Sequence, residues 1–178
     1  MATTALSSRR SGWVLLFLLL FGALTMVWSS DAVATFQDWF IQYFTVLPAV
    51  WLIALVDPAR GIMAAGAQLA APGGSLNVRA GCEGADMAFL LLSAMLCAPL
   101  SWRSRLAGLL LGLAFVFVLN QARVVALFYA LQHDRALFDL LHGTLLPLLL
   151  VVLISAFFVW WLGRWGTPLS AATAGGTP

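Results

Sequence analysis

Three polar side chains in an otherwise apolar sequence are of the types that acyl-transfer chemistry uses. Cys82 stands between glycines in Gly81-Cys82-Glu83-Gly84, Arg123 lies inside a long apolar stretch, and His142 lies near the start of the next one. A thiolate can attack a carbonyl carbon, an imidazole can transfer protons, and a guanidinium can stabilise the negative charge that develops. Together these groups would be sufficient to cleave a peptide bond through a covalent intermediate.

Each of these residues also has a purely structural interpretation. A lone cysteine inside a membrane is most often a small apolar filler, and Cys97 fits that description. Cys82 differs from it because flanking glycines and a helix N-terminus favour a reactive thiolate. A single histidine such as His142 is more often a hydrogen-bonded residue of a bundle, and His133 is expected in an outer loop. The combination of the three groups is what favours chemistry.

The composition defines the surroundings of these groups. The 178 residues are 62% hydrophobic and 9% charged, whereas soluble domains are about 45–50% apolar and about 25% charged. Disordered chains are poor in apolar residues, and only 2 cysteines exclude a disulfide scaffold. Nothing in the charge pattern indicates nucleic acid as a partner. We therefore predict an all-α integral membrane protein with a single helical bundle.

Four apolar stretches are predicted to span the bilayer, since a spanning helix needs roughly 20 residues. They are Trp13–Trp28, Gly84–Ala98, Leu106–Leu131 and Leu140–Leu162, and the second is short for this purpose. The domain organisation that follows is a cytoplasmic N-terminus (1–12), one membrane-embedded catalytic bundle (13–163) and a disordered cytoplasmic tail (164–178).

The stretch Phe36–Val56 mixes aromatic, polar and apolar residues, which is typical of a helix in the membrane interface. If it is interfacial or re-entrant on the outer face, the inner side carries only basic residues, which agrees with the positive-inside rule. These residues are Arg9, Arg10, Arg103, Arg105 and Arg164. If the stretch spans instead, a further crossing is needed before the second span.

Two other features of the chain leave alternatives open. The first apolar stretch is predicted to be an uncleaved anchor, although Ala32-Val33-Ala34 also resembles a signal-peptide cleavage site. Farther along, Ala71-Pro72-Gly73-Gly74 predicts a turn, so a short outer-face hairpin is plausible before Cys82.

The three polar groups are expected at one depth in the outer leaflet. At 1.5 Å per residue, Arg123 lies about 12 Å along its helix from Leu131, and His142 lies about as far from Asp134, the predicted N-cap of the next helix. Cys82 begins the short second span, so it also falls below the outer surface. Cys97 lies more than about 20 Å from Cys82 along that helix, so the two cannot form a disulfide.

Three further residues could support this site. Asn120 lies one helical turn before Arg123 and could orient it, and Gly84 completes the glycine pair around the thiol. Asp139 lies one turn before His142 and could hold the imidazole ring. Alternatively, Asp139 is simply a favourable acid in the first turn of a helix.

These motifs resemble those of the exosortase/archaeosortase family. The resemblance rests on Gly81-Cys82-Glu83-Gly84, on Asn120-x-x-Arg123 and on His142 at the head of the last helix, and it covers Trp39 to Trp161. The run from Leu119 to Tyr129 is most similar to exosortase H.

The resemblance implies a cysteine transpeptidase of the bacterial inner membrane whose site faces the periplasm. It implies Cys82 as the nucleophile, Arg123 as the charge-stabilising group and His142 as the acid and base. Substrates would be exported proteins with a C-terminal sorting signal, which consists of a short motif, a transmembrane helix and a basic tail. For exosortase H the motif is of the Ile-Pro-Thr-Leu-x-x-Trp-Gly kind. The acceptor molecule is not identified by the resemblance.

One residue departs from the family pattern, because a small or neutral polar residue is expected where Glu83 follows the cysteine. A carboxylate there would raise the pKa of the thiol unless it points away or is paired, for example with Arg79. No cofactor is implied, and one Cys with one His falls short of a metal-ligand set. The alternative function is a non-enzymatic membrane subunit or small transporter that uses Arg123 and His142 as a polar relay.

Overall fold

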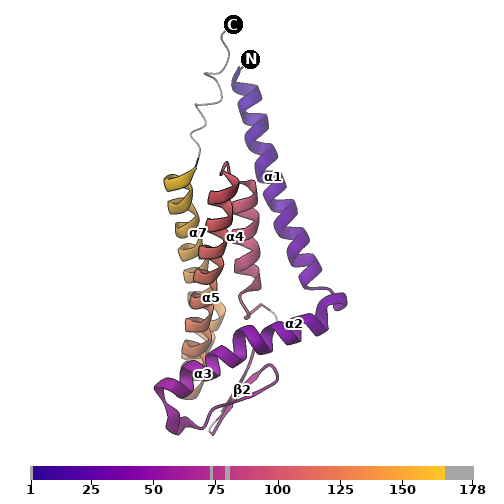
Figure 1. Cartoon of the computed structure of the whole chain (residues 1–178). Coiled ribbons are helices and arrows are strands. Elements are labelled where there is room, and N and C mark those ends of the chain that lie inside the picture. The colour runs from indigo at the N-terminus through magenta and orange to yellow at the C-terminus, as the bar shows by residue number, and fades with distance from the viewer. Residues whose placement is uncertain (1, 73, 79–80, 167–178) are drawn as a thin grey trace.

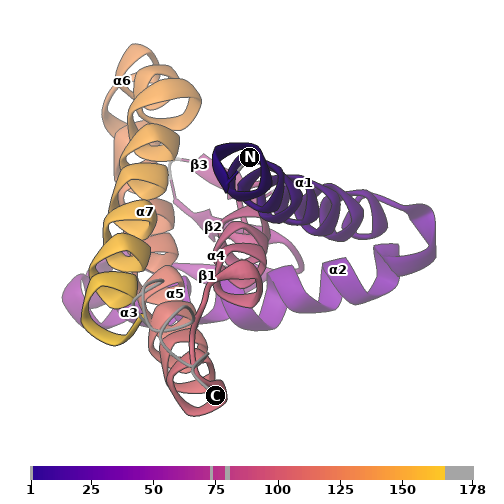
Figure 2. The ribbon, with the colours of Figure 1, turned by 90° about the horizontal axis from the view of Figure 1, so that it is seen from above.

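The computed structural model describes residues 2–72, 74–78 and 81–166 (Figure 1). Four long helical segments run side by side, as Figures 1 and 2 show from two directions. They are α1 (Ala2–Trp28), α4 (Ala85–Cys97), α5 (Trp102–His133) and a last segment that ends in α7 (Leu146–Trp165). These segments correspond to the four stretches predicted to span, and α4 is one residue shorter at each end than predicted. From residue 167 onward, the predicted tail lies outside the described residues.

Length and composition indicate which helices can cross a bilayer. Asp31–Val56, Trp102–His133 and Arg135–Trp165 are long and apolar enough, while Gly12–Trp28 and Ala85–Cys97 are shorter apolar helices. Large apolar side chains point outward from the bundle, among them Leu19, Leu110 and Val152 at 62%, 71% and 62% exposure. An apolar outer surface suits lipid and not water, so the chain has the fold of an all-α membrane protein.

A helical segment crosses the end of this bundle. After a short 3-10 turn, η1 (Asp31–Val33), it comprises α2 (Ala34–Phe40), the π-helix η2 (Ile41–Val46) and α3 (Leu47–Val56). In Figure 1 it runs transverse to α1, α4, α5 and α7. This direction agrees with the interfacial interpretation of Phe36–Val56, although its length would also allow a span. A 3-10 turn, η3 (Pro58–Arg60), follows it.

Both π-helices of the described chain end directly before a Leu-Pro pair. Pro48 has no N–H, so it cannot bond to the carbonyl of Phe44 one turn earlier. Gln121 of α5 supplies the missing donor, because its Nε2 donates to the Phe44 oxygen at 2.9 Å. The second π-helix, η4 (Leu141–Leu145), links α6 (Arg135–Leu140) to α7 and precedes Pro147 in the same way. Proline therefore accounts for the local widening of both helices.

A small antiparallel sheet lies beside the transverse segment. Its strands are β1 (Met63–Ala65), β2 (Gln68–Ala71) and β3 (Gly74–Asn77), in the order β1-β2-β3. The predicted hairpin is the β2–β3 pair, with Ala71 opposite Gly74 at the predicted turn. β1 was not predicted, because its sequence is rich in alanine, which is a weak strand former.

The core beneath the sheet ties these elements to α5. It joins residues of the transverse segment, the sheet and the C-terminal half of α5. Among them, Leu69, Ile53 and Phe128 are 0%, 1% and 1% exposed. A second cluster packs α4, α5 and α7 together toward the other end. The sheet is therefore fixed against the part of α5 that carries Asn120 and Arg123.

Candidate active site

Cys82 lies in the loop directly before α4, and two glycines shape this loop. Gly81 and Gly84 have φ of 91° and 85°, which side chains other than glycine rarely adopt. A Cβ on Gly84 would also lie 2.9 Å from Cγ of Asn120. Because Gly84 has no side chain, the Asn120 side chain can pack against the loop, and its Nδ2 donates a hydrogen bond to the Glu83 carbonyl at 2.9 Å. Gly84 and Asn120 thus position the loop that carries Cys82. The side-chain hydrogen bond of Asn120 goes to this loop and not to Arg123, which it was predicted to orient.

The structure brings the three predicted groups together. Sγ of Cys82 lies 3.8 Å from Nδ1 of His142 and 3.9 Å from Nη2 of Arg123. Cys82 lies in the loop before α4, His142 in η4, and Arg123 in the C-terminal half of α5. Both contacts are within hydrogen-bonding distance for a sulfur atom. The guanidinium and the imidazole therefore converge on the thiol from different helices.

Arg123 is buried, with 6% exposure. Among the described residues it forms no ion pair with a carboxylate, and its Nε has no hydrogen-bond partner. A buried charge without a counter-ion is costly, and helices rarely retain such a group inside a membrane without a use for it. Its Nη2 contacts the Cys82 sulfur, and a thiolate there would be an anionic partner for the guanidinium.

The position of His142 is set by η4 and by an aromatic neighbour. Its ring stacks on Phe138, with 5.4 Å between the ring centres and 5° between the planes. Single π-helical turns are frequent at functional sites because they rotate side chains out of the regular helical register. Phe138 leaves the Nδ1 edge of the imidazole free to face the thiol.

The predicted role of Asp139 is not supported. Its carboxylate is 64% exposed and lies 3.8 Å from the guanidinium of Arg135, one turn earlier on α6. Asp139 forms no hydrogen bond or ion pair with His142, since its carboxylate is turned toward Arg135. Phe138 positions the imidazole in its place, and the aromatic residue four positions before His142 was the signal for it.

Glu83 points away from the thiol, although it is the next residue. The side chain is 5% exposed, and its Oε1 accepts a hydrogen bond from Nε1 of Trp28 at 2.7 Å. The Trp28 indole packs edge-on against three rings, those of Phe36, Phe40 and Phe89. Arg79, the partner suggested by the sequence, lies outside the described residues. Trp28 thus connects the end of α1 to the thiol loop.

The groups around the Cys82 thiol have opposing effects on its pKa. Burial raises the pKa of the Cys82 thiol above its ordinary value, the Arg123 guanidinium lowers that pKa, and the Glu83 carboxylate raises it further. Burial is the largest of these effects, so the thiol is protonated at rest. Ionisation then requires an acceptor for the proton, and the nearest one is Nδ1 of His142.

The reactivity of Cys82 should therefore depend on pH, and substitution of Glu83 or Arg123 should shift this dependence in opposite directions. Thiolates, not thiols, react with alkylating reagents, so the rate should rise with pH through the raised pKa of Cys82. Glu83→Gln should shift this profile to lower pH, and Arg123→Gln should shift it to higher pH. The measurement is the rate of iodoacetamide labelling from pH 6 to 10 in a Cys97→Ala background. If the pH profile of Glu83→Gln were unchanged or shifted to higher pH, Glu83 would not raise the pKa of Cys82.

A cavity of about 400 Å³ adjoins the thiol. Its walls come from β3, α5, α6 and η4 and are formed by Leu76, Asn77, Val78, Cys82, Val124, Leu127, Arg135, Phe138 and His142. The cavity therefore gives a bound molecule access to the sulfur and to the imidazole together. Among the described residues, no group of three or more His, Cys, Asp or Glu side chains could hold a metal ion.

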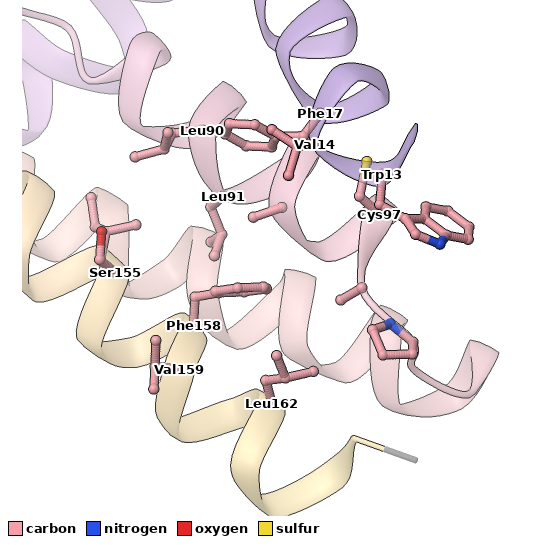
Figure 3. A pocket seen from close by; sticks show the side chains of 14 residues that line it. Trp13, Val14, Phe17, Leu90, Leu91, Cys97, Ser155, Phe158, Val159 and Leu162 are labelled. Carbon is pink, nitrogen blue, oxygen red and sulfur yellow. The ribbon is translucent and has the colours of Figure 1, made fainter. Parts of the chain in front are cut away.

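The other cysteine lies elsewhere. Cys97 borders an apolar pocket of about 440 Å³ between α1, α4 and α7 (Figure 3). The pocket is also lined by Trp13, Phe17 and Leu162 and by the polar residue Ser155. Of the described titratable side chains, none lines this pocket except Cys97 itself. His133 is exposed at the end of α5, as expected.

Comparison with known proteins places this geometry in a family. Residues 1–159 match the family model described as transmembrane exosortase (Exosortase_EpsH). No curated protein and no solved structure matches the chain. The match includes the thiol loop, Asn120, Arg123 and His142, which are the residues that carry the sequence resemblance. The chain belongs to the transmembrane exosortase family.

Proposed function

We propose that the protein is a membrane cysteine transpeptidase that cleaves the C-terminal sorting signal of exported proteins and transfers them to an acceptor. The observation that carries the proposal is the convergence of His142 Nδ1 and Arg123 Nη2 on the Cys82 sulfur, at 3.8 and 3.9 Å. Membership of the family supports the same activity.

In the first half of the reaction, Nδ1 of His142 takes the proton of the Cys82 thiol. The sulfur then forms a bond to the scissile carbonyl carbon, and the carbonyl oxygen becomes an oxyanion. Arg123, whose Nη2 lies beside the sulfur, stabilises this charge by a charge-assisted hydrogen bond. The C–N bond breaks as His142 returns the proton to the leaving amine, and a Cys82 thioester remains.

In the second half, His142 removes a proton from the acceptor nucleophile. The nucleophile bonds to the thioester carbon, and the C–S bond breaks to release the Cys82 thiolate. The proton on His142 then restores the thiol. An amine acceptor gives transpeptidation, and water gives simple hydrolysis.

The distribution of charge supports a bacterial inner-membrane location with the site facing the periplasm. The N-terminus of α1, the α4–α5 connection and the end of α7 gather at one end of the bundle, and the thiol loop and sheet lie at the other end (Figure 1). The five arginines assigned to the inner side, namely Arg9, Arg10, Arg103, Arg105 and Arg164, all belong to the first end. Basic residues concentrate on the cytoplasmic side of membrane proteins.

The two histidines offer a matched test of this function. His142→Ala should lower processing of a tagged sorting-signal substrate by about 10²–10⁴-fold, the usual contribution of an acid–base group. His133→Ala should retain processing, because that ring is exposed at the end of α5. The measurement is the shift of the substrate band on a gel, at equal abundance of both variants. Equal processing by the two variants would remove His142 from the mechanism.

Asp139→Asn gives a finer check of the same site. Since Asp139 pairs with Arg135 at the surface, the neutral variant should lose less than about threefold of activity, in keeping with the small energy of exposed ion pairs. A loss as large as that of His142→Ala would mean that Asp139 acts on the imidazole after all.

A further inference from the structure

The outer edge of β3 is unpaired in the described part of the chain. β3 is a terminal strand of the sheet, with only β2 beside it. Leu76 lies opposite Leu69, and the N–H of Val78 donates to the Ala67 carbonyl at 2.9 Å. Main-chain groups along a strand point alternately to its two sides, so those of Leu76 and Val78 point to β2. The N–H and C=O of Asn77, between them, point away from the sheet.

This edge lies in the same cavity as the thiol. Leu76, Asn77 and Val78 form one wall of the cavity of about 400 Å³, and Cys82 and His142 contribute to its lining as well. Seen along the bundle axis, β3 is the strand nearest to α6 (Figure 2). The edge is also held firmly, because the Leu76 and Val78 side chains are 7% and 3% exposed in the core.

The sequence of β3 leaves this edge without the usual protection. Natural edge strands carry lysine, proline, inward charges or bulges that prevent another strand from pairing with them. β3 reads Gly-Ser-Leu-Asn and has none of these residues. An edge that is unprotected and enclosed in a cavity is suited to a single added chain.

We propose that the free edge of β3 binds the substrate as an added strand and so delivers its scissile carbonyl to Cys82. The inference rests on the proposed function and adds to it the mode of substrate recognition. An extended peptide presents alternating N–H and C=O groups that complement those of Asn77. The main chain would provide alignment along β3, and the cavity walls at Leu127 and Phe138 would select side chains.

A peptide fits this site better than a lipid or a second copy of the sheet. Asn77 lines the cavity, and its outward N–H and C=O offer a main-chain donor and acceptor. A peptide matches such a pair at strand spacing, and an acyl chain does not. Arg135, Phe138 and His142 also line this cavity, whose volume of about 400 Å³ leaves room for a short peptide segment. The site therefore takes one extended chain.

Proline substitution tests the outward N–H of Asn77. Proline removes an N–H and is tolerated on an edge strand when that N–H faces away from the sheet. Asn77→Pro should lower cleavage of a synthetic peptide containing an Ile-Pro-Thr-Leu-x-x-Trp-Gly motif at least tenfold more than Asn77→Ala, which keeps the N–H. Labelling of Cys82 by iodoacetamide should persist in Asn77→Pro and show that the thiol loop is intact.

The opposite edge of the sheet provides the matched control. Since Leu69 bonds toward β3, Gln68 and Ala70 bond toward β1, where they lie opposite Ala65 and Met63. Ala64 therefore points its N–H away from the sheet, at the edge that does not line the cavity. Ala64→Pro makes the same chemical change and should retain cleavage.

A scan of the peptide checks the inference on the wild-type protein, so that it does not depend on a variant folding. N-methylation of one amide at a time along the peptide should reduce cleavage at alternate positions, because strand pairing has a period of two. Loss at alternate positions supports strand addition even if Asn77→Pro fails to accumulate. Equal loss at neighbouring positions, or equal cleavage by Asn77→Pro and Asn77→Ala, overturns it. A wild-type protein that leaves the unmodified peptide intact overturns the proposed function itself.

Discussion

Cys82→Ala should abolish processing of a sorting-signal substrate, with a loss of at least about 10³-fold, whereas Cys97→Ala should remain within about twofold of wild type. Removal of a nucleophile leaves only the binding and charge-stabilising contributions of a site. Arg123 and His142 would still be present in the Cys82 variant but would have no sulfur to act on. Cys97, in contrast, lines the apolar pocket between α1, α4 and α7 and is not part of the candidate active site (Figure 3).

The two cysteine variants control for each other, since each removes one thiol. Cys97 is the last residue of the 13-residue helix α4, and Cys82 lies in the loop before this helix. Both should accumulate in the membrane at similar levels, and a tagged substrate then reports processing directly. Comparable processing by Cys82→Ala and wild type would refute a cysteine mechanism. A loss in Cys97→Ala at normal abundance would point to a role for the second pocket.

The second large effect concerns Arg123. If only positive charge were required beside the sulfur, lysine would partly replace it. An arginine fork can donate to a thiolate and to an oxyanion at the same time, and an ammonium cannot reproduce this planar geometry. Loss of one well-placed oxyanion donor costs about 10²–10³ in rate. Arg123→Lys should therefore be close to inactive in a cellular processing assay.

A matched control is available at the other end of the bundle. Arg103 is exposed near the start of α5 and far along that helix from Arg123, so Arg103→Lys should process the substrate normally. Arg135 is less suitable because it borders the cavity at the thiol. Abundance has to be equal, because a buried unpaired cation also destabilises the bundle. Near-normal processing by an abundant Arg123→Lys protein would remove Arg123 from the catalytic set.

Much of this arrangement could be predicted from single features of the sequence. The apolar stretches identified the helices, since length and hydropathy are local properties. The rise of 1.5 Å per residue placed Arg123 and His142 at one depth, and the structure brings both to Cys82. The turn at Ala71–Gly74 indicated the β2–β3 hairpin because proline and glycine restrict the backbone locally.

Other features depend on contacts that the sequence does not express locally. The hydrogen bond from Trp28 to Glu83 joins residues 55 positions apart, and no periodicity indicates such a pair. Helical spacing allows both Asp139 and Phe138, three and four residues earlier, to lie near His142. The sequence does not show that Asp139 pairs with Arg135 while the Phe138 ring stacks on the imidazole. The position of β3 beside the thiol depends on how the sheet packs on α5 and η2.

The central claim is that Cys82 forms a covalent acyl intermediate. The most direct measurement is mass spectrometry of the purified wild-type protein after brief exposure to a sorting-signal substrate and rapid acid quenching. The proposed mechanism predicts an acyl adduct on the peptide that contains Cys82, sensitive to hydroxylamine as thioesters are, and absent from Cys82→Ala. It also predicts that His142→Ala accumulates less of the adduct. Cleaved substrate without any adduct on Cys82, or an adduct confined to Cys97, would contradict the mechanism.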